Sequence, residues 1–89
     1  MTQQEPPKIE FPCHYSIRVM GDAHESFVDT VFELIYEHAP EIKREDVKTK
    51  DSRHGRYMSV HVVIYATGVE QLEAIHLSLQ SYESVKMVI

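Results

Sequence analysis

Hydrophobic and polar residues alternate along two stretches of the chain, with the period of two that is typical of β-strands. In residues 14–20 the apolar positions are Tyr15, Ile17 and Val19. In residues 57–65 they are Met58, Val60, Val62 and Ile64. The second stretch is long and rich in β-branched residues, so it predicts a central strand.

Two other stretches carry apolar residues at helical spacing. The first covers residues 25–38 and ends at Ala39-Pro40, because a proline pushes the preceding residue out of the α region. The second begins at Thr67, which has the Thr-x-x-Glu spacing of a capping box with Glu70. It continues to about residue 80, and its predicted buried stripe is Val69, Leu72, Ile75, His76 and Leu79.

Weaker patterns complete the chain. Residues 46–52 predict a short polar strand whose lysines suit a sheet edge. Residues 53–56 predict a hairpin loop in which Gly55 can adopt a positive φ angle. Residues 85–89 alternate again as a last strand, with Val88 pointing away from the core. Residues 1–10 are polar with two prolines and predict a flexible tail.

The resulting order is β-α-β-β-α-β within one domain, residues 11–89. Right-handed crossovers place both helices on the same side of the sheet. The sequence therefore predicts an α+β, ferredoxin-like open-faced sandwich. Two helices cover one face of a four-stranded antiparallel sheet, with the first and third strands in its centre.

The uncovered side of this sheet is called the open face. Its predicted interaction residues are Ser16, Arg18, Lys48, Lys50, Tyr57, Ser59, His61, Tyr65 and Lys86. The set contains four cations and no acid, whereas most acids fall on the helices. This separation either reflects ordinary solvation or serves an acidic or phosphate-bearing partner. Exposed tyrosines beside Met20, Val63 and Val88 also suit self-association, so we expect a homodimer.

Composition narrows the function classes. The net charge of −5 opposes general attraction to nucleic acid or anionic membranes. A single cysteine cannot form an internal disulfide, which suits a reducing cytoplasm. Apolar runs are far shorter than the ~20 residues of a membrane span, and the N-terminal residues do not resemble a signal peptide. We expect a cytoplasmic protein.

Catalytic and metal chemistry have little support. The six histidines lack the paired spacing of zinc ligands, so no metal and no other cofactor is expected. Cys13 has no recognisable partners for nucleophilic catalysis and is expected to be an inert, buried or half-buried residue. We therefore predict that the protein is not an enzyme. Weak binding of single-stranded RNA remains an alternative, although the first strand offers Ser16 and Arg18 where RNA-binding sheets carry aromatic residues.

The end of the first strand is the other candidate site. Gly21 and Asp22 are expected to break the strand, and the following helix start can offer backbone N–H donors to an anion. The alternative is a plain strand-to-helix turn. The candidate ligand-binding residues are Met20, Gly21, Asp22, Ala23 and His24.

Several short motifs in order make the chain resemble a known family. They are Phe11-Pro12, Val19-Met20-Gly21, Val28-Asp29, His38-Ala39-Pro40, Gly55-Arg56-Tyr57-Met58-Ser59-Val60, Ala66-Thr67, Glu70-Gln71 and Val85-Lys86-Met87-Val88-Ile89. This combination, over about residues 11–89, resembles the YbeD-like family of small bacterial proteins. The resemblance implies a ferredoxin-like fold similar to ACT-type regulatory domains, which bind small molecules near the first strand-helix turn. It implies no catalytic residue.

Together these features predict a small ACT-like regulatory or interaction domain that acts through protein–protein contact on the open face. One alternative is a sensor of an amino acid or anionic metabolite at the Gly21 turn. The other alternative is the weak RNA binder.

Overall fold

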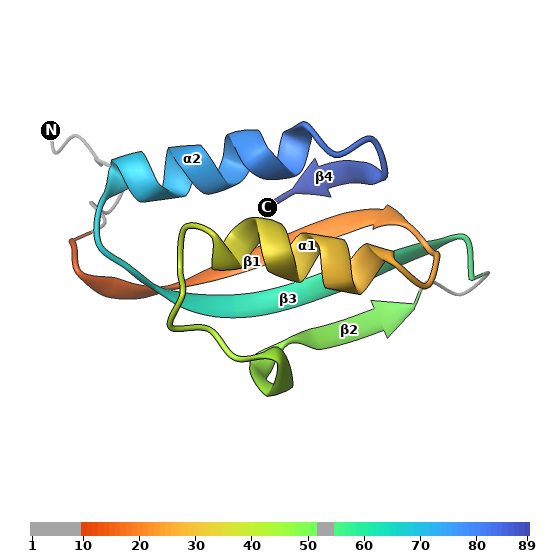
Figure 1. Ribbon diagram of the computed structural model, residues 1–89, viewed down its shortest axis with the longest axis horizontal. Helices are drawn as coiled ribbons and strands as arrows, with labels where there is room; N and C mark the ends of the chain where they lie inside the picture. The colour runs from red at the N-terminus through yellow and green to blue at the C-terminus, as the bar shows by residue number, and fades with distance from the viewer. Residues whose placement is uncertain (1–9, 52–54) are drawn as a thin grey trace, which may run out of the picture.

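The computed structural model describes residues 10–51 and 55–89. Its elements are β1 (Cys13–Asp22), α1 (Phe27–Tyr36), the 3₁₀ helix η1 (Arg44–Asp46), β2 (Lys48–Asp51), β3 (Tyr57–Ala66), α2 (Val69–Gln80) and β4 (Val85–Val88). The strands form one four-stranded antiparallel sheet in the order β2-β3-β1-β4 (Figure 1). The predicted ferredoxin-like fold is confirmed, with β1 and β3 in the centre.

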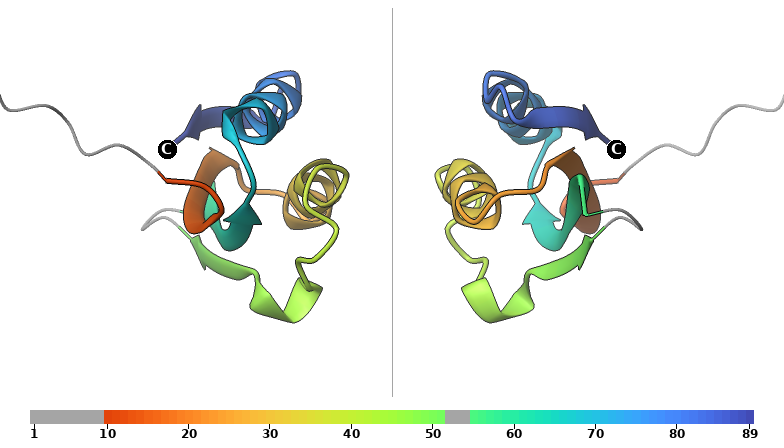
Figure 2. Two further views of the ribbon diagram at one scale, coloured as in Figure 1. Left: turned by 90° about the vertical axis from the view of Figure 1, so that its left-hand side faces the viewer. Right: turned by 90° about the vertical axis from the view of Figure 1, so that its right-hand side faces the viewer.

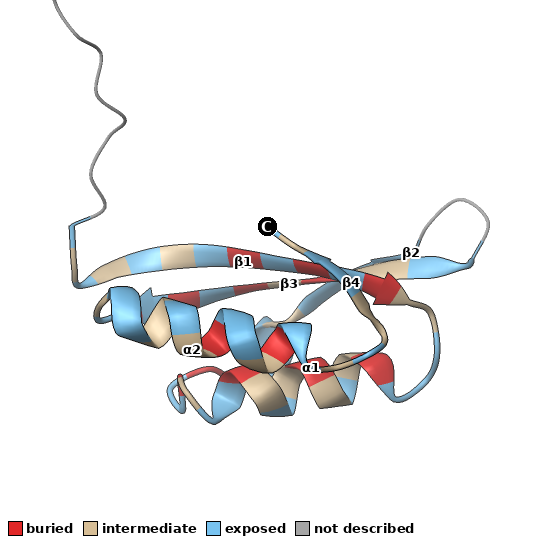
Figure 3. Ribbon diagram, turned by 90° about the horizontal axis from the view of Figure 1, so that it is seen from above, coloured by how far each residue is buried: buried red, intermediate tan, exposed pale blue. Residues whose placement is uncertain are grey.

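The molecule has two layers. Both helices lie on the same side of the sheet, as the end-on views in Figure 2 and the view from above in Figure 3 show. The core between the layers is built from alternate residues of β1 and β3 and from one stripe of each helix. Its buried side chains are Ile17, Val19, Phe27, Val31, Ile35, Ala39, Ile42, Val60, Val62, Ile64, Ala66, Ile75 and Leu79.

The predicted break at Gly21 and Asp22 is wrong, because β1 continues through both residues. Gly21 does not adopt a positive φ angle; among the described residues only Gly55, at φ 69°, does so. Gly21 is required for packing instead. A Cβ atom there would lie 2.1 Å from the Ser84 carbonyl oxygen and 2.5 Å from Phe27 Cε1.

The helix predictions need three corrections. Helix α1 begins at Phe27 and ends at Tyr36, so it is shorter at both ends than predicted. The N-cap of α2 is Gly68, and the predicted capping box is wrong: the amide of Thr67 donates to Gln71 Oε1 at 2.8 Å. Val69 and His76 are exposed rather than part of the buried stripe. Val69 is the first residue of α2, and His76 is turned about 100° around the helix from the buried Ile75.

A register shift between Met20 and Gly21 changes the predicted facing of β4. Val88 lies opposite the buried Val19, and Met87 lies opposite Met20 on the open face. The prediction that Val88 points outward is therefore wrong. The positive φ angle of Gly55 is confirmed, whereas Arg53 and His54 of the predicted hairpin loop, and residues 1–9 of the predicted tail, lie outside the described residues.

Candidate functional site

Cross-strand pairing arranges the open face in rows. Lys48 and Arg18 both pair with His61, from β2 and β1 respectively, so the three residues form one row across the sheet. Directly opposite residues of antiparallel strands point to the same face. The next row carries Lys50, Ser59, Met20 and Met87. Two lysines and one arginine thus surround His61 and Ser59.

A hollow of about 420 Å³ lies over these rows, and we call it the cationic hollow. Its volume falls within the range of small-ligand sites. Its lining residues are Arg18, Met20, Lys48, Thr49, Lys50, Asp51, Tyr57, Met58, Ser59 and His61. Asp51 is therefore one acid beside three cations, where the sequence predicted none.

The cations of the hollow are not neutralised by ion pairs within residues 10–51 and 55–89. The ion pairs of this part of the chain join Arg44 to Asp29, at 2.6 Å, and Lys86 to Asp22, at 3.6 Å. Arg18, Lys48 and Lys50 are exposed. Their charges therefore add to a positive potential over one side of a protein whose net charge is −5.

Polar contacts hold the floor of the hollow. The Ser16 hydroxyl contacts His61 Nε2, which orients the half-buried imidazole toward β1. The Ser59 hydroxyl donates to the Lys50 carbonyl oxygen at 3.5 Å. Six predicted interaction residues are thus brought together: Ser16, Arg18, Lys48, Lys50, Ser59 and His61.

The other three predicted interaction residues lie outside this cluster, although Tyr57 also lines the cationic hollow. Tyr57 and Tyr65 are near opposite ends of β3, and the Tyr65 ring meets the edge of His14 with ring centroids 5.2 Å apart. Lys86 pairs with Asp22 and also donates to the Glu83 carbonyl oxygen at 3.3 Å. Asp22 follows Met20 on β1 in the same alternation, which adds a second acid to this side of the sheet.

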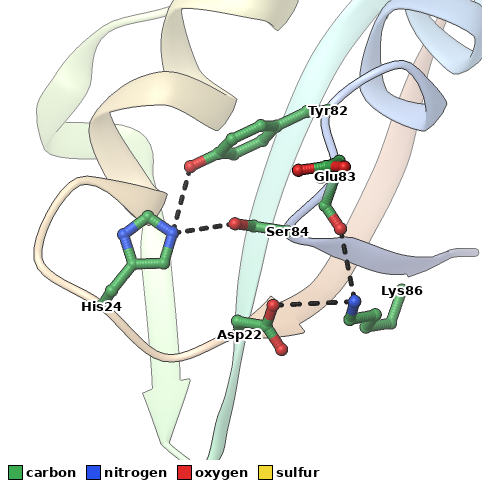
Figure 4. Close-up of polar contacts among 6 residues, drawn as sticks. All are labelled: Asp22, His24, Tyr82, Glu83, Ser84 and Lys86. Carbon is green, nitrogen blue, oxygen red and sulfur yellow. Dashed lines mark hydrogen bonds and ion pairs between the residues drawn. The ribbon is translucent and has the colours of Figure 1, made fainter.

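The predicted ligand turn is tied to the loop between α2 and β4 (Figure 4). His24 Nε2 lies 3.0 Å from Ser84 Oγ and 3.1 Å from the Tyr82 hydroxyl oxygen. The Asp22 amide donates to the Ser84 carbonyl oxygen at 2.9 Å, and the Ala23 amide donates to the Arg56 carbonyl oxygen at 3.0 Å. The Asp22 and Ala23 amides are therefore not available to a ligand, and an anion at Met20–His24 would have to use the amides at the start of α1. Tyr82 and Ser84 were missed, because no local pattern links residues 58 and 60 positions away.

A second hollow lies on the outer side of α2. It is lined by Val69, Leu72, Glu73, His76, Leu77 and Gln80. Leu77 is 68% exposed there. Neither this helix nor α1 is long and apolar enough to cross a membrane, within the part of the chain that the structure describes. No group of three potential metal-ligating side chains occurs in that same part.

Comparison with known proteins places the chain in a family. Residues 6–89 match the family model described as "Protein of unknown function (DUF493)". The chain is similar to a UPF0250 protein of Azotobacter vinelandii, with 53% identity over 89 residues, covering 99% of this chain and 97% of the relative. A UPF0250 protein of Chromobacterium violaceum is 37% identical and is covered over its full length, as is this chain.

The fold also has a counterpart of known structure. The solution structure of protein HP0495 from H. pylori superposes with a TM-score of 0.70, covering 99% of this chain and 98% of that one. At 16% identity, this similarity concerns the fold alone. The family match and the full-length relatives agree with the resemblance carried by the sequence motifs, and the chain therefore belongs to the DUF493 (UPF0250) family of small, YbeD-like bacterial proteins of unknown function.

Proposed function

We propose that the protein is a small regulatory or interaction domain that acts through protein–protein contact on its open face. The observation that carries this proposal is the cationic hollow, where Arg18, Lys48 and Lys50 are exposed without ion-pair partners among the described residues. Both helices lie on the other side of the sheet, so this surface is accessible to a partner (Figure 3).

The open face also has the mixed chemistry of a protein interface. Met20, which lines the hollow, lies beside Met87, and the two side chains are 37% and 53% exposed. Methionine, arginine and aromatic residues are enriched in protein interfaces, and the flexible methionine side chain adapts to different partners. An apolar edge beside a cationic centre favours a protein over a purely polar ligand.

Two alternatives have less support from the geometry. RNA-binding sheets stack bases on aromatic residues of two central strands, but Ser16 and Arg18 occupy those places on β1. The net charge of −5 further opposes RNA. A sensor at the Gly21 turn would have to use the amides at the start of α1, because the Asp22 and Ala23 amides already donate to the Ser84 and Arg56 carbonyl oxygens.

Photo-crosslinking in the native cell tests the proposal. We would replace Met87, on the open face, with benzoylphenylalanine, and in a matched control replace Leu77, on the outer side of α2. Protein adducts from position 87 that are absent from position 77 are the expected result. Adducts from position 77 alone, or adducts from position 87 that nuclease digestion removes, would contradict the proposal.

A further inference from the structure

We propose, resting on the proposed function, that the open face recognises an acidic, extended segment of a partner protein. Its carboxylates would be bound by Arg18, Lys48 and Lys50 around the cationic hollow. The proposed function identifies the binding surface. The charges of this surface and their spacing indicate the chemistry of the partner.

The spacing of the cations matches an extended chain. Lys48 and Lys50 are two residues apart on β2, which separates their Cα atoms by about 6.6 Å. An extended peptide repeats its side chains on one side at the same interval of about 6.6 Å. Carboxylates at alternate positions can therefore meet both lysines at once.

Arg18 extends the site across the sheet. It lies two strands from Lys48, or about 9.5 Å away between Cα atoms. Its guanidinium can bind a carboxylate with two parallel hydrogen bonds, which a lysine cannot do. The half-buried His61 lies between Arg18 and Lys48 in the same row. A third carboxylate of the segment would reach Arg18 by passing over His61.

A second copy of this chain is a poorer occupant. Two open faces in contact would bring the same cations together. Two copies could also pair their β2 edges to form one continuous sheet with all helices on one side. Directly opposite residues share a face, so this pairing would place the lysines of one β2 opposite the lysines of the other. Docking of the open face onto the acidic helices of another copy would be a head-to-tail contact, which builds a ring or an open-ended chain of molecules rather than a closed dimer.

RNA is also a poorer occupant than an acidic segment. Screening limits the attraction of exposed charges to about 8 Å at physiological salt. A short segment in the hollow would therefore experience chiefly the local cations. A longer polyanion such as RNA would extend beyond the hollow and be repelled by the rest of the protein, whose net charge is −5.

Titration of the full ¹⁵N-labelled chain with synthetic peptides tests the partner chemistry. One peptide has ten residues of alternating glutamate and threonine, and its control has glutamine in place of each glutamate. We expect the glutamate peptide to shift the amide resonances of Arg18, Lys48, Lys50 and His61, and we expect the glutamine peptide to leave them unchanged. The shifts should weaken as salt is added, because the contacts are ionic and exposed.

Matched charge variants locate the binding. Lys48→Gln with Lys50→Gln should weaken binding of the glutamate peptide about fivefold, since exposed ion pairs each contribute a fraction of a kcal/mol. Lys43→Gln with Arg44→Gln removes the same charge from a nearby exposed segment and should change binding less than twofold. Equal weakening by both pairs would overturn the proposal.

Three further results would also overturn it. These are no shift on the open face with the glutamate peptide, tighter binding of a ten-nucleotide oligouridine than of that peptide, and equal shifts with inorganic phosphate at the same concentration. If the peptide fails in these ways while protein adducts from position 87 persist in the Lys48 and Lys50 double variant, the acidic-segment proposal fails and the proposed function stands. If position 87 gives no protein adducts even in the protein that keeps Lys48 and Lys50, the proposed function itself fails.

Discussion

Gly21 and Phe27 are packed so closely that no side chain fits between them. A Cβ atom on Gly21 would lie 2.5 Å from Phe27 Cε1, and the Ser84 carbonyl oxygen approaches the same position to 2.1 Å. Phe27 is completely buried and begins α1. This contact lets the first helix and the loop before β4 close over the end of β1.

Gly21→Ala should therefore be strongly destabilising. Neither the Ser84 backbone nor the enclosed Phe27 ring can move freely, so we expect a loss of about 3 kcal/mol in the free energy of unfolding, at the upper end for overpacking. Urea denaturation measures this loss. Gly68→Ala is the control, because nothing lies within 4 Å of a Cβ there. Equal stability of the two variants would show that the close approach is not required.

Gly55 has a different requirement. Its φ angle of 69° lies in the left-handed region, whereas a Cβ there would meet no atom within 4 Å. Gly55→Ala should cost about 1 kcal/mol through backbone strain alone. Gly55→Asn should recover part of this loss, because asparagine tolerates the left-handed region better than alanine. Identical denaturation midpoints for the alanine and asparagine variants would contradict this explanation.

Gln71 joins α2 to the turn that follows α1. Its Oε1 accepts the Thr67 amide at 2.8 Å, and its Nε2 donates to the His38 carbonyl oxygen at 2.6 Å. Gln71→Glu keeps the acceptor but places a carboxylate oxygen against that carbonyl, so we expect a loss of about 1–2 kcal/mol. Gln80→Glu makes the same change at an exposed position of α2 and should be near neutral. Equal thermal midpoints for the two variants would refute the link.

The contacts of His24 with Tyr82 and Ser84 should be energetically coupled. Tyr82→Phe and Ser84→Ala each remove one hydroxyl within reach of His24 Nε2, and each should cost about 0.5–1 kcal/mol. In the His24→Ala background these losses should shrink, which a double-mutant cycle measures as an interaction energy of about 0.5 kcal/mol. Tyr36→Phe removes an exposed hydroxyl from α1 and is the control. Strict additivity would mean that the hydroxyls act independently of His24.

Asp51 should weaken the binding of an acidic segment, because it is the carboxylate that lines the cationic hollow. Asp51→Asn should tighten binding of the alternating glutamate–threonine peptide about twofold, by removal of one exposed repulsive charge. Asp46→Asn, in η1 and outside the hollow lining, should have less effect. A fluorescence anisotropy titration at low salt compares the two. Tighter binding with Asp46→Asn than with Asp51→Asn would contradict the assigned position of the segment.

The sequence by itself determined the order of elements and the facing of the central strands. Side chains alternate along a strand with a period of two, so the apolar positions of β1 and β3 determined which neighbours reach the open face. Arg18 and His61 followed from this alternation, and so did Lys48 and Lys50. The family motifs led to the same fold by a separate route.

Only the tertiary structure decided how these residues meet. The row of Lys48, His61 and Arg18 depends on pairing between strands, which no local pattern contains. The register shift in β4 exchanged the expected facing of Met87 and Val88. Gly21 appeared to be a turn residue because glycine is common in turns, but the packing of Phe27 and Ser84 against it is the reason for a glycine there. Contacts between distant residues arise only when the layers pack, and they decide which surfaces stay open.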